Sequence, residues 1–154
     1  RSSAASDVYK RQANSCTLLE EVENFPGDLG KNVENVDCWD IFSYCYSLCQ
    51  TEVNFPYAKM RRVSFPGTDT RRSVPISRLV FHPDSPFDLK GDANHINIKY
   101  CRFERKGLVE LFELLPDFSG GTTRQIDITG NPGAEELTEE ERQIATDKNW
   151  IIVG

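Results

Sequence analysis

Cysteine and histidine are the side chains of this sequence that could bind a metal ion or form disulfides. There are five cysteines and two histidines: Cys16, Cys38, Cys45, Cys49, Cys101, His82 and His95. Zinc sites are typically marked by C-x-x-C or H-x-x-x-H spacings, and the sequence contains neither. The pattern therefore favours small buried cysteines over a metal site. An odd cysteine count argues against a complete disulfide framework, and a bridge between Cys38 and Cys49 stays open for an exported protein.

The two histidines lie close to acidic residues, an arrangement that could serve acid–base catalysis. His82 precedes a turn with Asp84, and His95 follows Asp92. No Ser, Cys or second His stands at a spacing that identifies a nucleophile and its base. Surface or hydrogen-bonded histidines are the favoured interpretation. We expect a protein that is not an enzyme, with no catalytic residue and no cofactor.

Three further groups of residues could bind ions or charged partners. The acidic run of residues 135–141 lacks the alternating oxygen ligands and central glycine of a calcium loop, and acids in a first helical turn are explained by the helix dipole. Gly120-Gly121-Thr122-Thr123 is a glycine turn without the lysine of a phosphate loop. Arg61-Arg62 and Arg71-Arg72 form a small basic region that could contact an acidic partner.

The segment Ile126 to Gly154 predicts the elements that position these residues. Its start, IDITGN, fits the L-x-L-x-x-N/C core of a leucine-rich repeat. The amide of Asn131 is expected to satisfy backbone groups in the turn that follows the strand. Thr138 and Glu141 stand at capping-box spacing and open a helix. A last strand, residues 150–153, places Trp150 as a lid over the end of the core.

The same pattern occurs thirty residues upstream. Ile96-Asn97-Ile98-Lys99-Tyr100-Cys101 matches IDITGN position for position, with Cys at the place of Asn131. A helical stripe follows, and it stops before Pro116: Leu108, Leu111, Phe112 and Leu115. Two units of strand, turn, helix and return are therefore in register.

The period shortens between residues 51 and 92. Val63-Ser64-Phe65 and Leu79-Val80-Phe81 lie sixteen residues apart, and Ile96 follows seventeen residues after Leu79. Such steps leave room for a strand and loops but hardly for a helix. We expect loop-like turns on the convex side here. Further upstream, Cys16-Thr17-Leu18-Leu19 and Cys45-Tyr46-Ser47-Leu48 indicate one or two irregular repeats.

These phrases carry a family resemblance. Leu79 to Gly154, with INIKYC, GLVELFELLPD, IDITGNPGAEELT and IATDKNW, resembles the C-terminal end of bacterial surface leucine-rich-repeat proteins. Upstream, residues 32–36 and 41–48 resemble a BspA-like surface repeat. The resemblance implies an α/β leucine-rich-repeat solenoid with a short-stranded parallel sheet, helices on the convex side near the C-terminus and a C-terminal cap. It also implies a cell-surface or extracellular location.

The first residues differ in origin from the rest. SSAASDVYKRQ, residues 2–12, is what translation of a sequencing-library adapter gives, so residues 1–12 are expected to be an adapter-derived or disordered tail. The expected leucine-rich-repeat domain is 13–154, with irregular repeats in 13–92 and regular repeats and the cap in 93–154. The adapter implies that the sequence is a fragment of a longer gene.

Charge restricts the partners of the chain. The net charge is −6, and without residues 1–12 there are 15 Lys and Arg against 23 Asp and Glu. An acidic domain of this kind is repelled by nucleic acid and by anionic lipid, so we expect neither as a partner. No apolar run approaches the length of a membrane span, and direct membrane insertion is not expected.

A solenoid of this class offers a rigid strand face on which outward side chains can vary, which suits the binding of a protein or a glycan. We therefore expect a non-enzymatic binding or adhesion module of a cell-surface leucine-rich-repeat protein. The alternative is a structural or receptor-reading appendage of a phage or cell-envelope assembly. The predicted binding face consists of Ser64, Val80, Asn97, Lys99, Tyr100, Asp127 and Thr129.

Overall fold

The computed structural model describes residues 36–39, 42–49, 51–57, 59–88 and 95–154. The first of the two expected irregular repeats, the phrase at residues 32–36 except its last residue, and the tail 1–12 lie outside the described residues. The elements along the chain are β1 (Val36–Trp39), β2 (Glu52–Phe55), β3 (Met60–Ser64), β4 (Arg78–Phe81), β5 (Ile96–Asn97), α2 (Arg105–Leu114), β6 (Arg124–Asp127), α3 (Glu139–Thr146) and β7 (Trp150–Val153).

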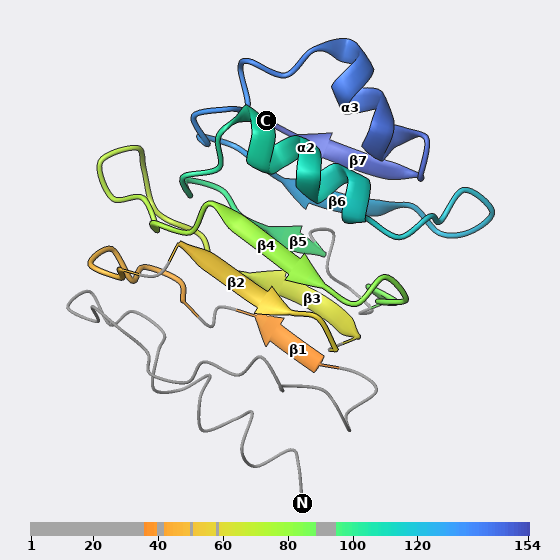
Figure 1. Ribbon diagram of the computed structural model, residues 1–154, viewed down its shortest axis with the longest axis horizontal. Helices are drawn as coiled ribbons and strands as arrows, with labels where there is room; N and C mark the ends of the chain where they lie inside the picture. Colours follow the sequence, from red (N-terminus) through yellow and green to blue (C-terminus); the bar gives the residue numbers. More distant parts are fainter. Residues whose placement is uncertain (1–35, 40–41, 50, 58, 89–94) are drawn as a thin grey trace, which may run out of the picture.

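The fold is mixed α/β and has two layers. One layer is a five-stranded parallel sheet in the order β1-β3-β5-β6-β7. The other contains the parallel pair β2-β4, then α2 beside β4 and α3 beside α2. Figure 1 shows β2, β4 and α2 lying in front of the five-stranded sheet. The chain therefore crosses from one layer to the other and back between successive strands of the large sheet.

The strands of the large sheet align in register. Ile96 pairs with Ile126, as the sequence predicts, and Ile126 pairs in turn with Ile152 of β7. On the other side, Ile96 pairs with Val63 of β3. Val63, Ile96 and Ile126 are fully buried and Ile152 packs against the same hydrophobic core, so this row points toward the second layer. The prediction that aliphatic residues stack across neighbouring strands in the C-terminal half is confirmed.

The predicted short period between residues 51 and 92 is wrong. Val63 and Leu79 do not lie on successive strands of one sheet, because β3 pairs directly with β5 whereas β4 pairs with β2. The step of sixteen residues spans half of a full circuit, from a strand in one layer to a strand in the other. The second layer therefore holds a pair of strands in this region, where loop-like turns were expected.

The hydrophobic core fills the space between the layers. Val53 and Leu79 are buried at paired positions of β2 and β4, and so are Phe55 and Phe81. The apolar stripe of α2 continues the same layer toward the C-terminus, and three of its residues are buried: Leu108, Leu111 and Phe112. The strands β2 and β4 and then the helix α2 thus cover the large sheet. The buried residues follow the two-residue period of a strand in β2 and β4 and the 3.6-residue period of a helix in α2.

Asn131 has the role that the sequence predicts. Its Nδ2 donates to the backbone oxygens of Ile98 and Ile128, both at 2.8 Å, and its Oδ1 accepts from the backbone nitrogen of Phe103 at 3.0 Å. At the matching place one strand earlier, the Sγ of Cys101 donates to the backbone oxygen of Phe65 at 3.4 Å. Burial raises the pKa of the Cys101 thiol, so it keeps the proton that it donates.

The predicted capping box at the start of α3 is also confirmed. Thr138 and Glu141 form both bonds of a capping box at the start of α3. The Arg105 guanidinium and the Thr138 amide lower the pKa of the Glu141 carboxyl. At the C-terminal end of α2, the ammonium of Lys148 donates to the backbone oxygens of Phe112 and Glu113, at 2.9 and 2.7 Å. A cation at this end suits the helix dipole.

Trp150 covers the end of the core, as predicted. Only 1% of its surface is exposed, and its Nε1 donates to the backbone oxygen of Pro116 at 2.9 Å. Phe87 meets the indole edge to face with ring centroids 5.3 Å apart, and Phe118 lies 5.9 Å away at a tilt. The indole satisfies its single donor and fills a large volume with ring contacts.

Candidate binding surface at the strand ends

Three of the predicted binding residues lie in the turns directly after β5 and β6. Lys99 and Tyr100 follow β5, Thr129 follows β6, and all three are partly exposed. The Tyr100 amide donates to the backbone oxygen of Thr129 at 2.7 Å, which joins the two turns. We define the strand-end surface as the partly exposed turn residues that follow the strands of the large sheet: Tyr44, Lys99, Tyr100, Thr129 and Gly130. Pro66 and Gly67 stand at the equivalent place after β3 but are buried.

A left-handed backbone conformation occurs at three of the four equivalent positions that follow the strands, and Gly67 after β3 lacks it. Tyr44, Tyr100 and Gly130 have φ angles of 65°, 51° and 71°. This left-handed region is uncommon for tyrosine, and surrounding contacts must hold it there. Hydrogen bonds between neighbouring turns do so, each from the amide of one turn to the carbonyl of the next: Tyr44 to Pro66 at 3.1 Å, Gly67 to Lys99 at 2.9 Å and Tyr100 to Thr129 at 2.7 Å.

Tyrosine and glycine alternate at the equivalent positions of this row, which are Tyr44, Gly67, Tyr100 and Gly130. A Cβ atom on Gly130 would lie 2.3 Å from Cδ1 of Tyr100, so the Tyr100 ring lies directly against the glycine backbone. A larger residue at 130 would displace the ring. Glycine is needed here for its positive φ and for this close approach.

The expected exposure of Ser64, Asn97 and Asp127 is wrong. They form one row across β3, β5 and β6, and their exposed fractions are only 0, 7 and 9%. Two of them bond to the turns that follow their own strands: Asn97 Oδ1 accepts from the Lys99 amide at 3.4 Å, and Asp127 Oδ1 accepts from the Thr129 amide at 3.0 Å. Their polar groups shape the strand-end surface from within instead of offering contacts to a ligand.

Val80 does not belong to the same face as the other predicted residues. It lies on β4 and pairs with Asn54 of β2, in the two-stranded sheet of the second layer. The error follows from the misjudged period, because Leu79-Val80-Phe81 has the same alternating pattern as Val63-Ser64-Phe65. The predicted binding face thus reduces to Lys99, Tyr100 and Thr129.

The histidines make ordinary structural hydrogen bonds. Nδ1 of His95 accepts from the Gln125 amide at 3.3 Å, and His95 is 8% exposed. Nδ1 of His82 accepts from the Asp84 amide at 3.0 Å. Asp92 lies outside the described residues. Both imidazoles therefore fit the hydrogen-bonded interpretation that the sequence favours.

Four cysteines fall within the described part of the chain, and all four are free thiols: Cys38, Cys45, Cys49 and Cys101. The bridge left open between Cys38 and Cys49 is not formed. Among the residues that the structure describes, no group of three or more His, Cys, Asp or Glu side chains could hold a metal ion.

The two arginine pairs differ in their environment. Arg61 and Arg62 are each paired with a carboxylate, Asp88 and Asp37, at 3.0 Å. Arg71 and Arg72 are exposed in the loop between β3 and β4, and their side chains contact no carboxylate of the described residues. The basic region that the sequence indicates therefore separates into a neutralised pair and an uncompensated pair.

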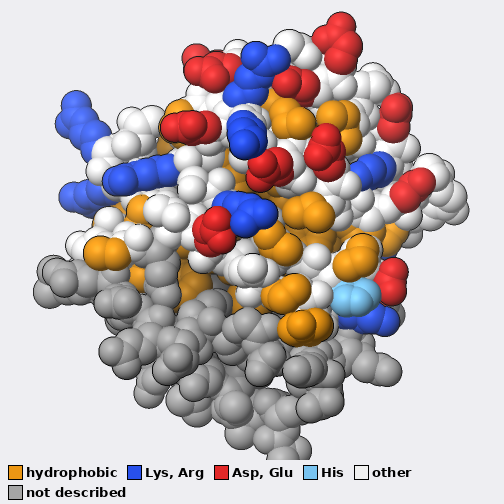
Figure 2. All heavy atoms as spheres, in the orientation of Figure 1, with side chains coloured by type: hydrophobic (Ala, Val, Ile, Leu, Met, Phe, Trp, Pro, Cys, Tyr) orange, Lys and Arg blue, Asp and Glu red, His pale blue; other side chains and the backbone are white. Residues whose placement is uncertain are grey.

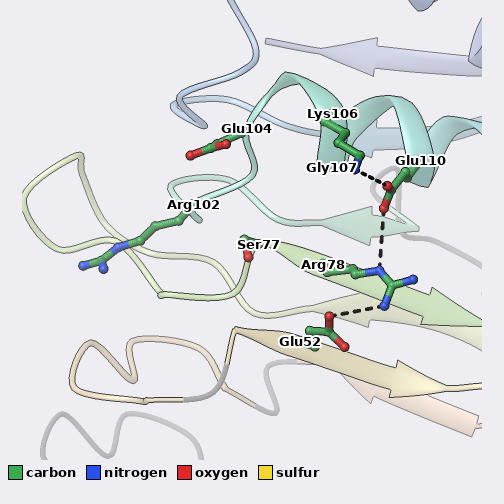
Figure 3. A pocket seen from close by; sticks show the side chains of 8 residues that line it. All are labelled: Glu52, Ser77, Arg78, Arg102, Glu104, Lys106, Gly107 and Glu110. Atoms are coloured by element: carbon green, nitrogen blue, oxygen red, sulfur yellow. Dashed lines mark hydrogen bonds and ion pairs between the residues drawn. The ribbon is translucent and has the colours of Figure 1, made fainter.

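A second surface feature is a groove between β4 and the start of α2, with a volume of about 450 Å³. Its charged side chains form a chain of ion pairs, in which Arg78 bridges Glu52 at 3.2 Å and Glu110 at 3.6 Å, and Lys106 reaches Glu110 at 3.8 Å. Figure 3 shows Arg78 between the two carboxylates. These exposed charges neutralise one another, so the groove offers little net attraction to a charged ligand.

The groove was not foreseen from the sequence. Lys106 and Glu110 stand at the i,i+4 spacing of a helical ion pair, which is a local signal. The contact of Glu52 with Arg78 depends on the pairing of β2 with β4, and no local pattern reveals it.

The comparisons with known proteins give no relative. No family model, no curated protein and no solved structure matches the chain. Within the part of the chain that the structure describes, no helix is long and apolar enough to cross a membrane.

Proposed function

We propose that this chain is a non-enzymatic binding module, built as a leucine-rich-repeat solenoid, of a protein displayed on a cell surface. The strand-end surface would be its recognition site, and the ligand a protein or a glycan. The sequence resemblance to bacterial surface repeats supports the location and the repeat class.

One observation carries this proposal: the segments that follow successive strands are hydrogen-bonded to one another at equivalent positions. Asn131 and Cys101 are also equivalent to each other, because each side chain donates to a backbone oxygen just after the preceding strand of the large sheet. A row of segments bonded in this way holds its side chains at the regular spacing of a parallel sheet, about 4.8 Å per strand. Such a row suits an extended ligand that makes repeated contacts.

The partly exposed side chains of this row are of types that commonly contact ligands. Tyr100 offers a partly exposed ring, Lys99 a cation and Thr129 a hydroxyl group. Aromatic side chains contribute contact area at a small cost in conformational entropy, and the neighbouring glycine fixes the position of the Tyr100 ring. A preorganised surface loses less entropy when it binds.

The test is binding to a panel of immobilised glycans and extracellular-matrix proteins, measured for wild type and for Tyr100→Asn. Asparagine tolerates a positive φ, so the variant removes the ring and keeps the turn. Tyr57→Asn is the matched control, since Tyr57 is 50% exposed in the turn after β2. We expect a ligand whose affinity falls about tenfold in Tyr100→Asn and stays unchanged in the control.

Two results would contradict the proposal. One is the absence of any ligand with a Kd below about 1 mM, the weakest affinity that the panel would register. The other is a ligand whose affinity falls equally in both variants, because its contacts would then lie elsewhere or depend on general stability. Thermal unfolding of each variant shows whether the turn is intact.

A further inference from the structure

The loop between β3 and β4 is fastened to the strand-end surface. Three backbone hydrogen bonds connect it to the segment 99–102: Gly67 N to Lys99 O at 2.9 Å, Val74 N to Tyr100 O at 3.0 Å and Arg102 N to Ile76 O at 2.9 Å. The Arg102 side chain adds a fourth link, from Nε to the Ser73 hydroxyl at 3.1 Å. These bonds bring the exposed residues of the loop beside Lys99 and Tyr100.

The tip of the loop is also closed within itself. Oδ1 of Asp69 accepts from the amides of Arg71 at 2.8 Å and of Arg72 at 3.0 Å, and the Thr68 amide donates to the Arg72 carbonyl at 3.2 Å. The carboxylate of Asp69 is therefore occupied by backbone amides of the loop. This arrangement holds the two arginines on a tight turn and leaves their guanidinium groups free of this acid.

The result is a cluster of cations without carboxylate partners among the described residues. We call Arg71, Arg72, Lys99 and Arg102 the basic cluster. In contrast, other arginines are paired at 3.0 to 3.2 Å: Arg61, Arg62, Arg78 and Arg105. Figure 2 shows Lys and Arg side chains gathered at the left, at the end where Figure 1 places the loop between β3 and β4. In a chain of net charge −6, such a local reversal of sign attracts anions to one place.

The surroundings of the basic cluster are polar and aromatic. The Tyr100 ring lies against Gly130, and the Tyr46 hydroxyl meets the Thr68 hydroxyl at 3.2 Å. Among the described residues, the exposed large apolar side chains are Tyr57, Leu114 and Ile151, and they belong to other segments of the chain. The cluster therefore lacks the apolar anchor that the core of a protein interface normally contains.

We infer that the basic cluster and Tyr100 together recognise an acidic glycan, a polysaccharide that carries uronate carboxylates. The guanidinium groups of Arg71 and Arg72 match carboxylates in bidentate geometry, and Lys99 adds a point charge. The Tyr100 ring gives a flat face for a pyranose ring, and hydroxyl groups beside it bond to the sugar. This inference rests on the proposed binding function and specifies its ligand.

Charge density separates this ligand from a nucleic acid. Double-stranded DNA carries about one negative charge per 1.7 Å of helix axis, and the acidic remainder of the chain repels it. A uronate chain carries one charge per sugar, which is fewer per unit length than a duplex, and it exposes polar and apolar sugar faces between the charges. An acidic peptide shares the carboxylates but lacks the ring to stack on Tyr100, so it serves as a comparison in the test.

The experiment is calorimetric titration with polygalacturonate, with its methyl-esterified form as a neutral ligand of the same backbone and with polyglutamate as an acidic peptide. The variant is Arg71→Gln with Arg72→Gln, and its control is Lys59→Gln with Lys106→Gln, which removes the same charge elsewhere. We expect the arginine variant to lose about tenfold in affinity for polygalacturonate and the lysine control to change less than twofold. Added salt should weaken wild-type binding, because exposed charges are screened.

Several outcomes would overturn the inference. They are equal affinity for the methyl-esterified polymer, equal affinity for polyglutamate with the same dependence on the arginines, and equal losses in the two double variants. Binding of a neutral glycan or a protein that requires Tyr100 but not the arginines would refute the acidic glycan and leave the binding module standing. Failure of every ligand would refute both proposals.

Discussion

Substitution of Asn131 by alanine tests the contacts that join β5, β6 and the start of α2. The side chain is 4% exposed and makes three hydrogen bonds to backbone groups, of Ile98, Ile128 and Phe103. The Ile128 carbonyl also accepts from the Asn131 amide at 3.2 Å, so alanine would leave it a partner. The Ile98 carbonyl and the Phe103 amide would both lose the bond to the side chain in a buried environment.

The expected cost follows from these two groups. A buried polar group left unpaired costs about 1–3 kcal/mol, which gives roughly 3–4 kcal/mol for Asn131→Ala after partial relaxation. In a domain of this size that corresponds to a fall in Tm of about 8–14 °C. Asn131→Cys should cost less, because cysteine at the matching place, Cys101, donates to a backbone oxygen of the preceding strand region.

Urea and thermal unfolding, followed by circular dichroism, measure these differences. Asn54→Ala is the matched control, because Asn54 is exposed on β2, and it should change the free energy of unfolding by less than about 0.5 kcal/mol. A loss below about 1 kcal/mol for Asn131→Ala would refute the assigned role, since it would mean that water or rearranged backbone replaces the amide. Equal stability of the Ala and Cys variants would refute the equivalence of positions 101 and 131.

Three further predictions concern the C-terminal half. Ile128→Asp should abolish the cooperative melting of the C-terminal half, because an unpaired charge would enter the core. Ile151→Asp should be tolerated, because Ile151 is 53% exposed. Similar melting temperatures of the two variants would contradict the burial of Ile128. Trp150→Ala should cost roughly 3–5 kcal/mol in urea unfolding and Trp150→Phe clearly less, and equal losses would deny the importance of the ring volume. The lowered pKa of Glu141 adds stability that is present above its unfolded value of about 4.3 and is lost as the pH falls through the folded value. When the pH is lowered from roughly 5 to 2, the Tm of Glu141→Gln should therefore fall less than the Tm of wild type. An equal fall in the Tm of both proteins would show that the contact with Arg105 contributes nothing.

The elements predicted correctly depend on local patterns. The capping box of Thr138 and Glu141, the stripe of α2 and the turn amide of Asn131 are each specified by residues within a few positions. A propensity or a capping bond acts along the chain, so the sequence displays it directly. Trp150 was placed correctly because a large apolar residue in a last strand has few other sites to fill.

The errors concern which segments meet in space. Val63 and Leu79 belong to equally convincing strands, but alternation does not say which partner each strand pairs with. In the same way, alternation gives the direction of Ser64 and Asn97 but not their exposure, which depends on neighbours thirty residues away. The sequence shows Arg71 and Arg72 as a basic pair but does not show that Lys99 lies beside them. That proximity depends on hydrogen bonds between segments distant in the sequence.

The change from strands to helices in the second layer affects the curvature of the molecule. Neighbouring strands lie about 4.8 Å apart, whereas packed helices need about 8–10 Å. Beside β2 and β4 both layers consist of strands with the same spacing, so this part of the large sheet can be straight. Beside α2 and α3 the second layer is wider than the sheet, which favours bending of the sheet away from the helices. The number of helical and strand-bearing segments in the second layer would therefore set how strongly a two-layered fold of this kind curves.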